Sequence, residues 1–322
     1  MPDAIDAHIH ILDADWVPEG MRRAWARQAA GRRLPDRDPE DLFERVSRGQ
    51  SDPDGDRTMA AFDRVGVRAA VVPVVDWTVV GRPAGTHLPI RALNARHEQL
   101  AARHPGRLFH CAGVDPRHAD AKDIATEALD AAHCRGLKLY PAAGWQADDD
   151  AHDWVYDLLE ERAGVAVFHT SPLGGDPLVT PNSRPAALAP VLARHPNLSF
   201  VFAHAGFEAW WLEALDIAHG WRSCYLEVSL WQHLADRDHA EFRRRMALVI
   251  DRLGAHRVLW GSDSIRGPLS DPDGEDLQRW LDQFSSLASS YEGTPPVVGR
   301  EEIDLMLAGN AVRLYRLPEG RP

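Results

Sequence analysis

Short apolar runs alternate with longer amphipathic stretches along the whole 322-residue chain. Apolar runs of this length are typical of buried strands, and their regular separation by helical stretches is typical of βα units in a parallel sheet. The pattern predicts eight strands, at residues 4–9, 69–75, 108–114, 136–140, 165–169, 198–203, 224–228 and 257–260.

Helices are predicted between these strands and beyond the last one. Several glycines stand where a helix would end and a strand begin, as C-terminal helix caps commonly do. The clearest helical stretches are residues 89–104, 119–133, 153–163 and 238–253, followed by two more near 276–289 and 300–314. Eight strands with intervening helices permit a closed (β/α)₈ TIM barrel or an open doubly wound sheet. The first strand precedes no glycine-rich dinucleotide fingerprint, which favours the barrel. We therefore expect a single domain spanning residues 1–322.

One segment interrupts this alternation of strands and helices. Residues 13–57 separate the first strand from its helix, and in a barrel an insertion there would lie over the mouth. The segment is rich in arginine, at Arg22, Arg23, Arg27, Arg32, Arg33 and Arg37. Two interpretations are open: a solvated helical excursion of mixed charge, or a lid that supplies an arginine to an anionic substrate.

Composition narrows the range of partners. The formal charge is −12, from 48 acidic and 36 basic residues, which argues against nucleic acid as a partner. The three cysteines, Cys111, Cys134 and Cys224, form no CxxC pair and are expected to be buried packing residues. There is no signal peptide, and no apolar run approaches the ~18 residues of a membrane span. We expect a cytoplasmic protein acting on a small molecule, away from membranes, with a homodimer left open.

The first predicted strand contains a His-x-His motif. Alternate residues of a strand share a face, so Asp6, His8 and His10 are expected on one face and the intervening apolar residues on the other. At the carboxyl end of a barrel strand, the two imidazoles would bind one metal ion. Taken alone, the motif is a weak indication.

Three further polar residues follow other predicted strands: His169, His204 and Asp263. Singly, each has a structural explanation, as a hydrogen-bonding histidine or a helix-capping aspartate. Jointly they suggest an active site, because barrel enzymes draw their catalytic residues from the carboxyl ends of the strands. Imidazoles together with a carboxylate suit zinc, with manganese as the alternative ion.

The motifs in this order resemble the amidohydrolase superfamily, in the branch that contains metal-dependent TIM-barrel hydrolases and aminocarboxymuconate-semialdehyde-type decarboxylases. They are DAHIH at 6–10, GLKLYP at 136–141, FHTS at 168–171, FAHAG at 202–206, WGSD at 260–263 and GNAVRLY at 309–315. The resemblance covers nearly the whole chain.

Residue roles follow from this resemblance. It implies that His8, His10 and His169 bind one divalent metal ion, with Asp263 as a further ligand or as a base beside it. His204 matches the position that contacts the activated water or the substrate.

Lys138 is expected to contact the substrate, with Tyr140 on the same strand face. A carbamylated Lys138 that bridges two metal ions, or a structural ion pair, are the alternatives.

The expected reaction is hydrolysis of an amide, lactone or ester, with Asp263 accepting a proton from water and His204 stabilising the oxyanion or orienting the water. The alternative is non-oxidative decarboxylation of an aromatic or muconate-like acid at the same site. A barrel that binds a small ligand without turnover is a third possibility, disfavoured by the full set of ligand-type residues.

Overall fold

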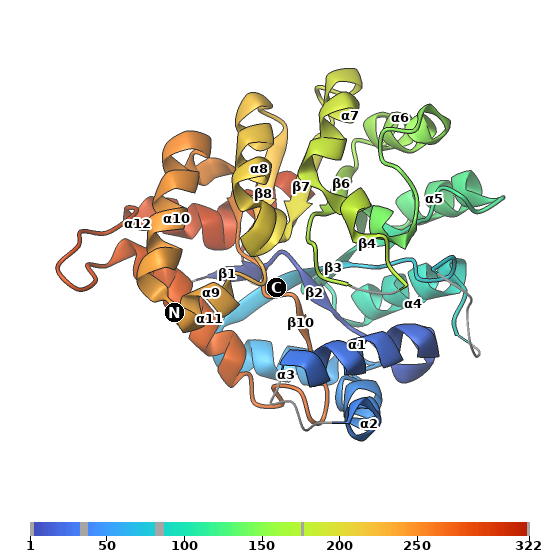
Figure 1. The fold of residues 1–322 in the computed structure, drawn as a ribbon, viewed down its shortest axis with the longest axis horizontal. Helices are drawn as coiled ribbons and strands as arrows, with labels where there is room; N and C mark the ends of the chain where they lie inside the picture. The colour runs from blue at the N-terminus through green and yellow to red at the C-terminus, as the bar shows by residue number, and fades with distance from the viewer. Residues whose placement is uncertain (1–2, 33–37, 81–86, 175–176, 321–322) are drawn as a thin grey trace.

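The computed structural model describes residues 3–32, 38–80, 87–174 and 177–320 (Figure 1). Its main sheet has eight parallel strands in the order β1-β3-β4-β5-β6-β7-β8-β9. They are β1 Ala4–Asp6, β3 Val67–Pro73, β4 Leu108–Gly113, β5 Cys134–Leu139, β6 Val165–His169, β7 Ser199–Ala203, β8 Cys224–Glu227 and β9 Val258–Leu259.

The first and last strands of this sheet are joined to each other. The backbone N–H of Ala7 donates to the carbonyl of Trp260 at 3.0 Å, and that of Asp263 donates to the carbonyl of His8 at 2.7 Å. A short parallel pair, β2 Ile9–His10 with β10 Ser264–Ile265, extends the junction. The predicted TIM barrel is therefore confirmed, with each strand found within a few residues of its expected place.

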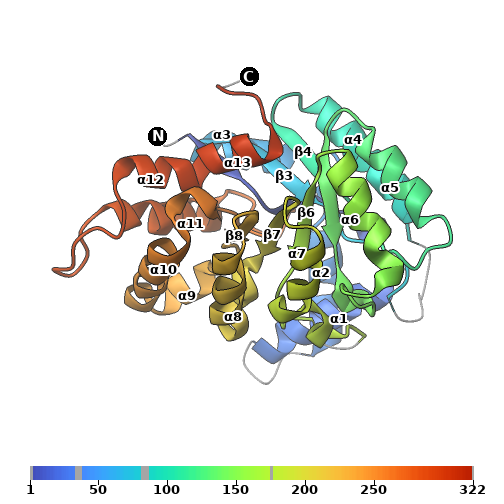
Figure 2. The same cartoon turned by 90° about the horizontal axis from the view of Figure 1, so that it is seen from above.

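Helices surround the sheet (Figures 1 and 2). Those that follow strands are α3 Asp56–Val65, α4 Ile90–Arg103, α5 Ala121–Leu129, α6 Asp153–Glu161, α7 Ala189–Arg194, α8 Phe207–Gly220, α9 Gln232–Arg237 and α10 His239–Leu253. The C-terminal part contains α11 Glu275–Ser285, α12 Arg300–Asp304, a π-helical turn at Leu305–Gly309 and α13 Asn310–Tyr315.

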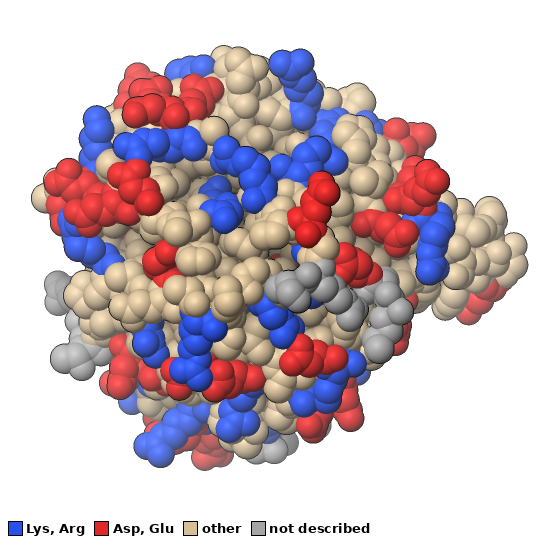
Figure 3. Space-filling model, turned by 180° about the vertical axis from the view of Figure 1, so that it is seen from behind, with Lys and Arg blue, Asp and Glu red and all other residues tan. Residues whose placement is uncertain are grey.

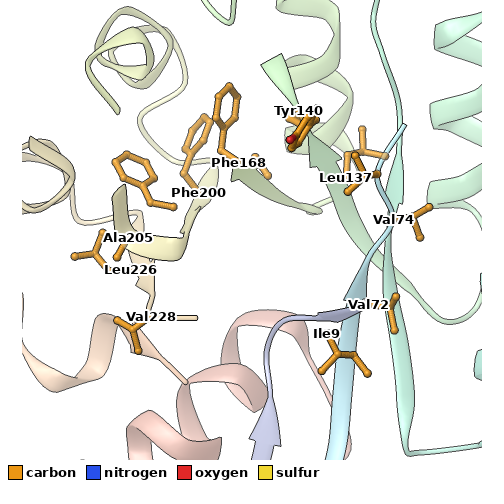
Figure 4. Packing of buried hydrophobic residues seen from close by; sticks show 14 of the residues in the cluster. Ile9, Val72, Val74, Leu137, Tyr140, Phe168, Phe200, Ala205, Leu226 and Val228 are labelled. Carbon is orange, nitrogen blue, oxygen red and sulfur yellow. The ribbon is translucent and has the colours of Figure 1, made fainter. Parts of the chain in front are cut away.

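Alternate strand residues supply two different cores. Outward-facing residues such as Phe168 and Phe200 pack beneath the helices, and Figure 4 shows them beside Leu137 and Leu226. Inward-facing residues such as Val167 form a smaller cluster inside the barrel, together with Leu314 and Tyr315 of the C-terminal segment. The barrel interior is thus packed with apolar side chains on the side of α13, and polar residues occupy the strands' carboxyl ends.

The first strand departs from its prediction. Residues 7 and 8 lie outside strand pairing, so β1 and β2 are separate elements. Ile5 and Ala7 join the inner cluster, whereas Ile9 joins the outer one. Strict alternation over residues 4–9 is therefore wrong, because the chain bends where it meets the last strand.

The inserted segment folds into two helices, α1 Glu19–Arg32 and α2 Pro39–Gly49. Figure 2 shows α1 at one end of the barrel, with α13 and both chain termini at the other. Arg22 donates to the hydroxyl of Ser47, and Arg23 binds Glu19 and Glu40.

No arginine of the described residues lines the cavity at the mouth. For Arg22, Arg23 and Arg27 the arginine-lid interpretation is therefore wrong, because the first two already have partners within the insertion and Arg27 faces a separate surface hollow. Arg33, Arg37 and the side chain of Arg32 lie outside the described part of the chain.

All three cysteines are buried and unpaired, as expected. In Figure 3, basic side chains gather across the upper part of this face, with acidic side chains mainly around them. Within the described residues, no helix combines the length and apolarity that crossing a membrane requires.

The close approach of β5 to β6 can be tested at Gly136. A Cβ at this position would lie 2.0 Å from the backbone oxygen of Val165 on β6. We predict that Gly136→Ala lowers the free energy of unfolding by about 2 kcal/mol or more, since backbone atoms of a paired strand must move. Urea unfolding measures this difference. The control is Gly220→Ala, where a Cβ meets nothing within 4 Å; equal stabilities for the two variants would contradict the prediction.

Candidate metal centre and its cavity

His8, His10 and Asp263 come together where the first and last strands join. Nε2 of His10 lies 3.1 Å from Oδ1 of Asp263, and Nε2 of His8 lies 3.5 Å from the same oxygen. Their ligand-type atoms are all within 4.8 Å of one another. Two imidazole nitrogens and a carboxylate oxygen at this spacing can hold one divalent ion.

His169 and His204 face this group from the ends of β6 and β7. Nε2 of His204 lies 3.2 Å from Nδ1 of His169. The His204 ring centroid lies 4.8 Å from that of His8, and 4.9 Å from that of His169. The four histidines therefore form one continuous cluster, in which His169 contacts His204 rather than Asp263.

Glu227, at the end of β8, binds several members of the cluster. Its Oε2 lies 2.8 Å from Nδ1 of His8 and accepts a hydrogen bond from the hydroxyl of Ser229 at 2.8 Å. The same hydroxyl lies 2.8 Å from Nδ1 of His204. Glu227, Ser229 and His8 are all fully buried, so this network is shielded from water.

Burial sets the protonation of the imidazoles. Desolvation holds the pKa of His8, His169 and His204 well below its usual value, and the nearby Lys138 acts in the same direction. Neutral imidazole is the form that binds a metal ion. The rings are thus in the protonation state that a metal site requires.

The two carboxylates respond differently to burial. Desolvation raises the pKa of Glu227 to about 7, although the hydrogen bonds from Ser229 and His204 oppose it. Desolvation also acts to raise the pKa of Asp263, but the hydrogen bond from His10 and the nearby His8 and Lys138 outweigh it, so that pKa is lowered overall. The pKa values of the two carboxyl groups are therefore shifted in opposite directions, and the site favours the ionised form of Asp263.

The residues present fit a metal ion. Nε2 of His8 and Nε2 of His169 are buried and have no hydrogen-bond partner among the described residues. Such orphaned nitrogens are costly unless a ligand satisfies them. A second set, His8, His204 and Glu227, is less suitable because its closest atoms already bind one another.

The cluster opens into a cavity of about 310 Å³. Its polar wall consists of His10, Lys138, Tyr140, His169, Ser171, His204 and Asp263. The rest of its lining is largely apolar and includes Trp77, together with Trp25, Gln28 and Gln50 from the insertion. The insertion thus contributes an aromatic ring and two neutral amides to the cavity.

Lys138 is the cation of this cavity. Its side chain is only 1% exposed, and within the described residues it makes no hydrogen bond or ion pair. Desolvation lowers the pKa of Lys138 to about 8, against the opposing charges of Asp263 and Glu227. The alternative that Lys138 forms a structural ion pair is therefore not supported, because no described residue pairs with it.

Several non-glycine residues at the mouth have positive φ. His204, Leu230 and Asp263 have φ values of 67°, 68° and 52°. Such conformations cost about 1–3 kcal/mol each and cluster at functional sites. The backbone is therefore strained where the candidate catalytic residues lie.

Sequence reasoning missed several of these residues. Glu227 and Ser229 stand at the end of a predicted strand, and nothing in their spacing points to His8. Trp25, Gln28 and Gln50 belong to the insertion, in which only the arginines are predicted to contact a substrate. The available signal is an acidic residue two positions before a serine, at the end of an apolar strand.

Residues 5–317 match the family model described as amidohydrolase. A search of curated proteins found no match. Solved structures share the fold over almost their full length. An uncharacterised TIM-barrel protein of Bordetella bronchiseptica is 18% identical with a TM-score of 0.66, covering 98% of this chain and 99% of that one.

Two similar structures are enzymes with different reactions. The 5-carboxyvanillate decarboxylase of Sphingomonas paucimobilis is 16% identical, with a TM-score of 0.64. A probable 2-pyrone-4,6-dicarboxylic acid hydrolase of Acinetobacter baumannii is 15% identical, with a TM-score of 0.60. Each covers 98% of this chain and 99% of its own. At these identities, the likeness shows the fold alone.

We predict that His10→Ala abolishes stoichiometric metal binding and leaves the barrel folded. His10 is partly exposed at the cavity, and the apolar cores do not include it. Elemental analysis should find roughly one divalent ion per wild-type chain and far less in the variant, while circular dichroism stays unchanged. His219→Ala is the control, because that ring binds a surface carbonyl of Arg252. Full metal content in His10→Ala would contradict the assignment.

Proposed function

Because the chain belongs to the amidohydrolase family, we propose that it is a metal-dependent hydrolase of an amide, lactone or ester of a small molecule. The observation that supports it best is that one cavity contains both a carboxylate whose ionised form is favoured, Asp263, and a buried ammonium without an ion-pair partner among the described residues, Lys138. Hydrolysis needs a base for water and a positive group for the developing oxyanion, and these two residues have that chemistry.

The metal would be held by His8, His10, His169 and Asp263, with zinc as the expected ion. Zinc prefers imidazole and carboxylate ligands, and two of these imidazoles have orphaned nitrogens. When bound, such an ion lowers the pKa of a coordinated water and polarises a carbonyl oxygen.

The protein residues would act around the scissile carbonyl. Asp263 accepts a proton from the attacking water and returns it to the leaving oxygen or nitrogen. Lys138 and the Tyr140 hydroxyl donate to the oxygen that gains charge. His204, expected to orient the water, contacts Ser229 and His169 through its two ring nitrogens and would act through His169.

The cavity also restricts the substrate. Trp25, Trp77 and Tyr140 line it, with Trp77 contacting each of the other two rings edge-on. Lys138 is the one cationic side chain among its described lining residues. We propose a compact substrate with a flat or apolar body and no more than one anionic group.

Decarboxylation is the second candidate, favoured by one observation. The Tyr140 hydroxyl and the Lys138 ammonium line the same cavity. A substrate carboxylate held near Lys138 and a proton delivered from Tyr140 to carbon would meet the needs of that reaction.

A substrate panel separates the two candidates. Lactones, esters and amides of aromatic or apolar acids form one set, and hydroxybenzoates with related unsaturated acids form the other. We expect hydrolysis in the first set and no CO₂ release in the second. Release of CO₂ without any hydrolysis would overturn the hydrolase proposal.

Lys138→Met should lower kcat/KM by about 10²-fold, as loss of an oxyanion donor does. The same change should leave stability unchanged or raise it, because it removes a buried charge without a partner. Turnover and urea unfolding are both measured. The chain's other lysine, Lys122, is exposed on α5, so Lys122→Met is the matched control. Parallel loss of activity and stability in Lys138→Met would instead indicate a structural residue.

A further inference from the structure

We propose that Glu227 and Ser229 are positioning residues that fix the tautomers of three histidines, so that His8 and His169 both present a bare Nε2 to the candidate metal site. The inference rests on the proposed metal site and is independent of which reaction the enzyme catalyses. It follows from the direction of each hydrogen bond in one buried network.

The starting point is the pair of backbone amides that contact Glu227. The N–H of Ser229 lies 2.5 Å from Oε1, and the N–H of His204 lies 3.2 Å from Oε2. A backbone N–H can only donate. Both oxygens therefore accept from the backbone, and in the ionised form of Glu227, which has no hydrogen of its own, every other polar hydrogen at Oε2 comes from its partner.

This direction determines the tautomer of His8. Its Nδ1 lies 2.8 Å from Oε2 of Glu227, so Nδ1 must bear the hydrogen. A neutral imidazole has a single N–H. Nε2 of His8 is then left with its lone pair, and it is the nitrogen near Asp263.

The hydrogen bonds of Ser229 then determine the tautomers of His204 and His169. The Ser229 hydroxyl has one hydrogen and donates it to Oε2, so its oxygen must accept from Nδ1 of His204. His204 then has a bare Nε2, which accepts from Nδ1 of His169 at 3.2 Å. That leaves Nε2 of His169 with a lone pair.

The buried nitrogens without a partner are consistent with this assignment. The nitrogens that the network leaves bare on His8 and His169 are the same two that are buried without a partner. If each hydrogen bond of the network ran in the opposite direction, Nε2 of His8 and Nε2 of His169 would each bear a hydrogen and could not bind a metal ion.

The network can be read directly in metal-free protein. Long-range ¹H–¹⁵N correlation of ¹⁵N-histidine-labelled protein distinguishes the Nδ1–H tautomer from the Nε2–H tautomer. We expect Nδ1–H for His8, His169 and His204, assigned with His→Gln variants at each position. An Nε2–H tautomer or an imidazolium at His169 or His204 would overturn the proposal.

Glu227→Gln should reverse the network. The short contact with the Ser229 N–H keeps the amide oxygen at the Oε1 position, so the amide nitrogen takes the place of Oε2 and donates. We expect His8, His204 and His169 to change to the Nε2–H tautomer, and zinc affinity to fall by 10²-fold or more, measured by competition with a chromophoric chelator. Unchanged tautomers and affinity would contradict the proposal.

Ser229→Ala provides a milder second variant. Losing the hydroxyl uncouples His204 from Glu227 without touching His8, and zinc affinity should fall by about 10–100-fold, as for other residues that orient metal ligands. The control is Ser183→Ala, a buried hydroxyl that has no described partner and lies outside the cavity.

The outcomes separate this inference from the proposed function. Nδ1–H tautomers in a wild-type protein that binds no zinc would leave the network correct and the metal proposal wrong. Stoichiometric zinc with Nε2–H tautomers in the metal-free protein would leave the metal proposal intact and the network wrong.

Discussion

The backbone contacts that close the barrel include a hydrogen bond between two residues of the site itself. The N–H of Asp263 donates to the carbonyl of His8 at 2.7 Å, and this contact joins the end of the first strand to the end of the last. The two residues are far apart in the chain, so their side chains meet only when the whole barrel has formed. The site is therefore a consequence of closure, and the order of strands between them fixes where His169, His204 and Glu227 arrive.

The sequence predicts those features that depend on periodicity. Buried strands are recognisable because inward and outward positions are both apolar, and a polar residue at a strand end, such as His169, then stands out. The break at residues 7–8 was not predictable, because it arises from contact with a strand more than 250 residues away. The contacts of Glu227 with the site were not predictable for the same reason, because its partners, His8 and His204, belong to other strands. The insertion was recognisable as an interruption, but which of its side chains face the cavity depends on how α1 packs against α2.

The use of lysine at the centre of the cavity has a physical rationale. The chain has two lysines among 36 basic residues, and one of them is Lys138. An arginine stays charged under all conditions in proteins, whereas a buried lysine can lose its proton. Because burial lowers the pKa of Lys138 to about 8, the residue can adjust its charge to the occupancy of a site that also contains Asp263. A guanidinium there would retain its full desolvation cost in the absence of an anion.

The polar cluster is difficult to explain as a structural feature. Orphaned nitrogens on His8 and His169, an unpaired ammonium on Lys138 and left-handed backbone at Asp263 all reduce stability. Apolar side chains in their place would extend the inner core, which already fills the opposite end of the barrel around Leu314. A fold that keeps these groups together needs something that satisfies them at once. A cation with imidazole and carboxylate ligands, next to a substrate oxygen that Lys138 can bind, meets each of these unsatisfied requirements.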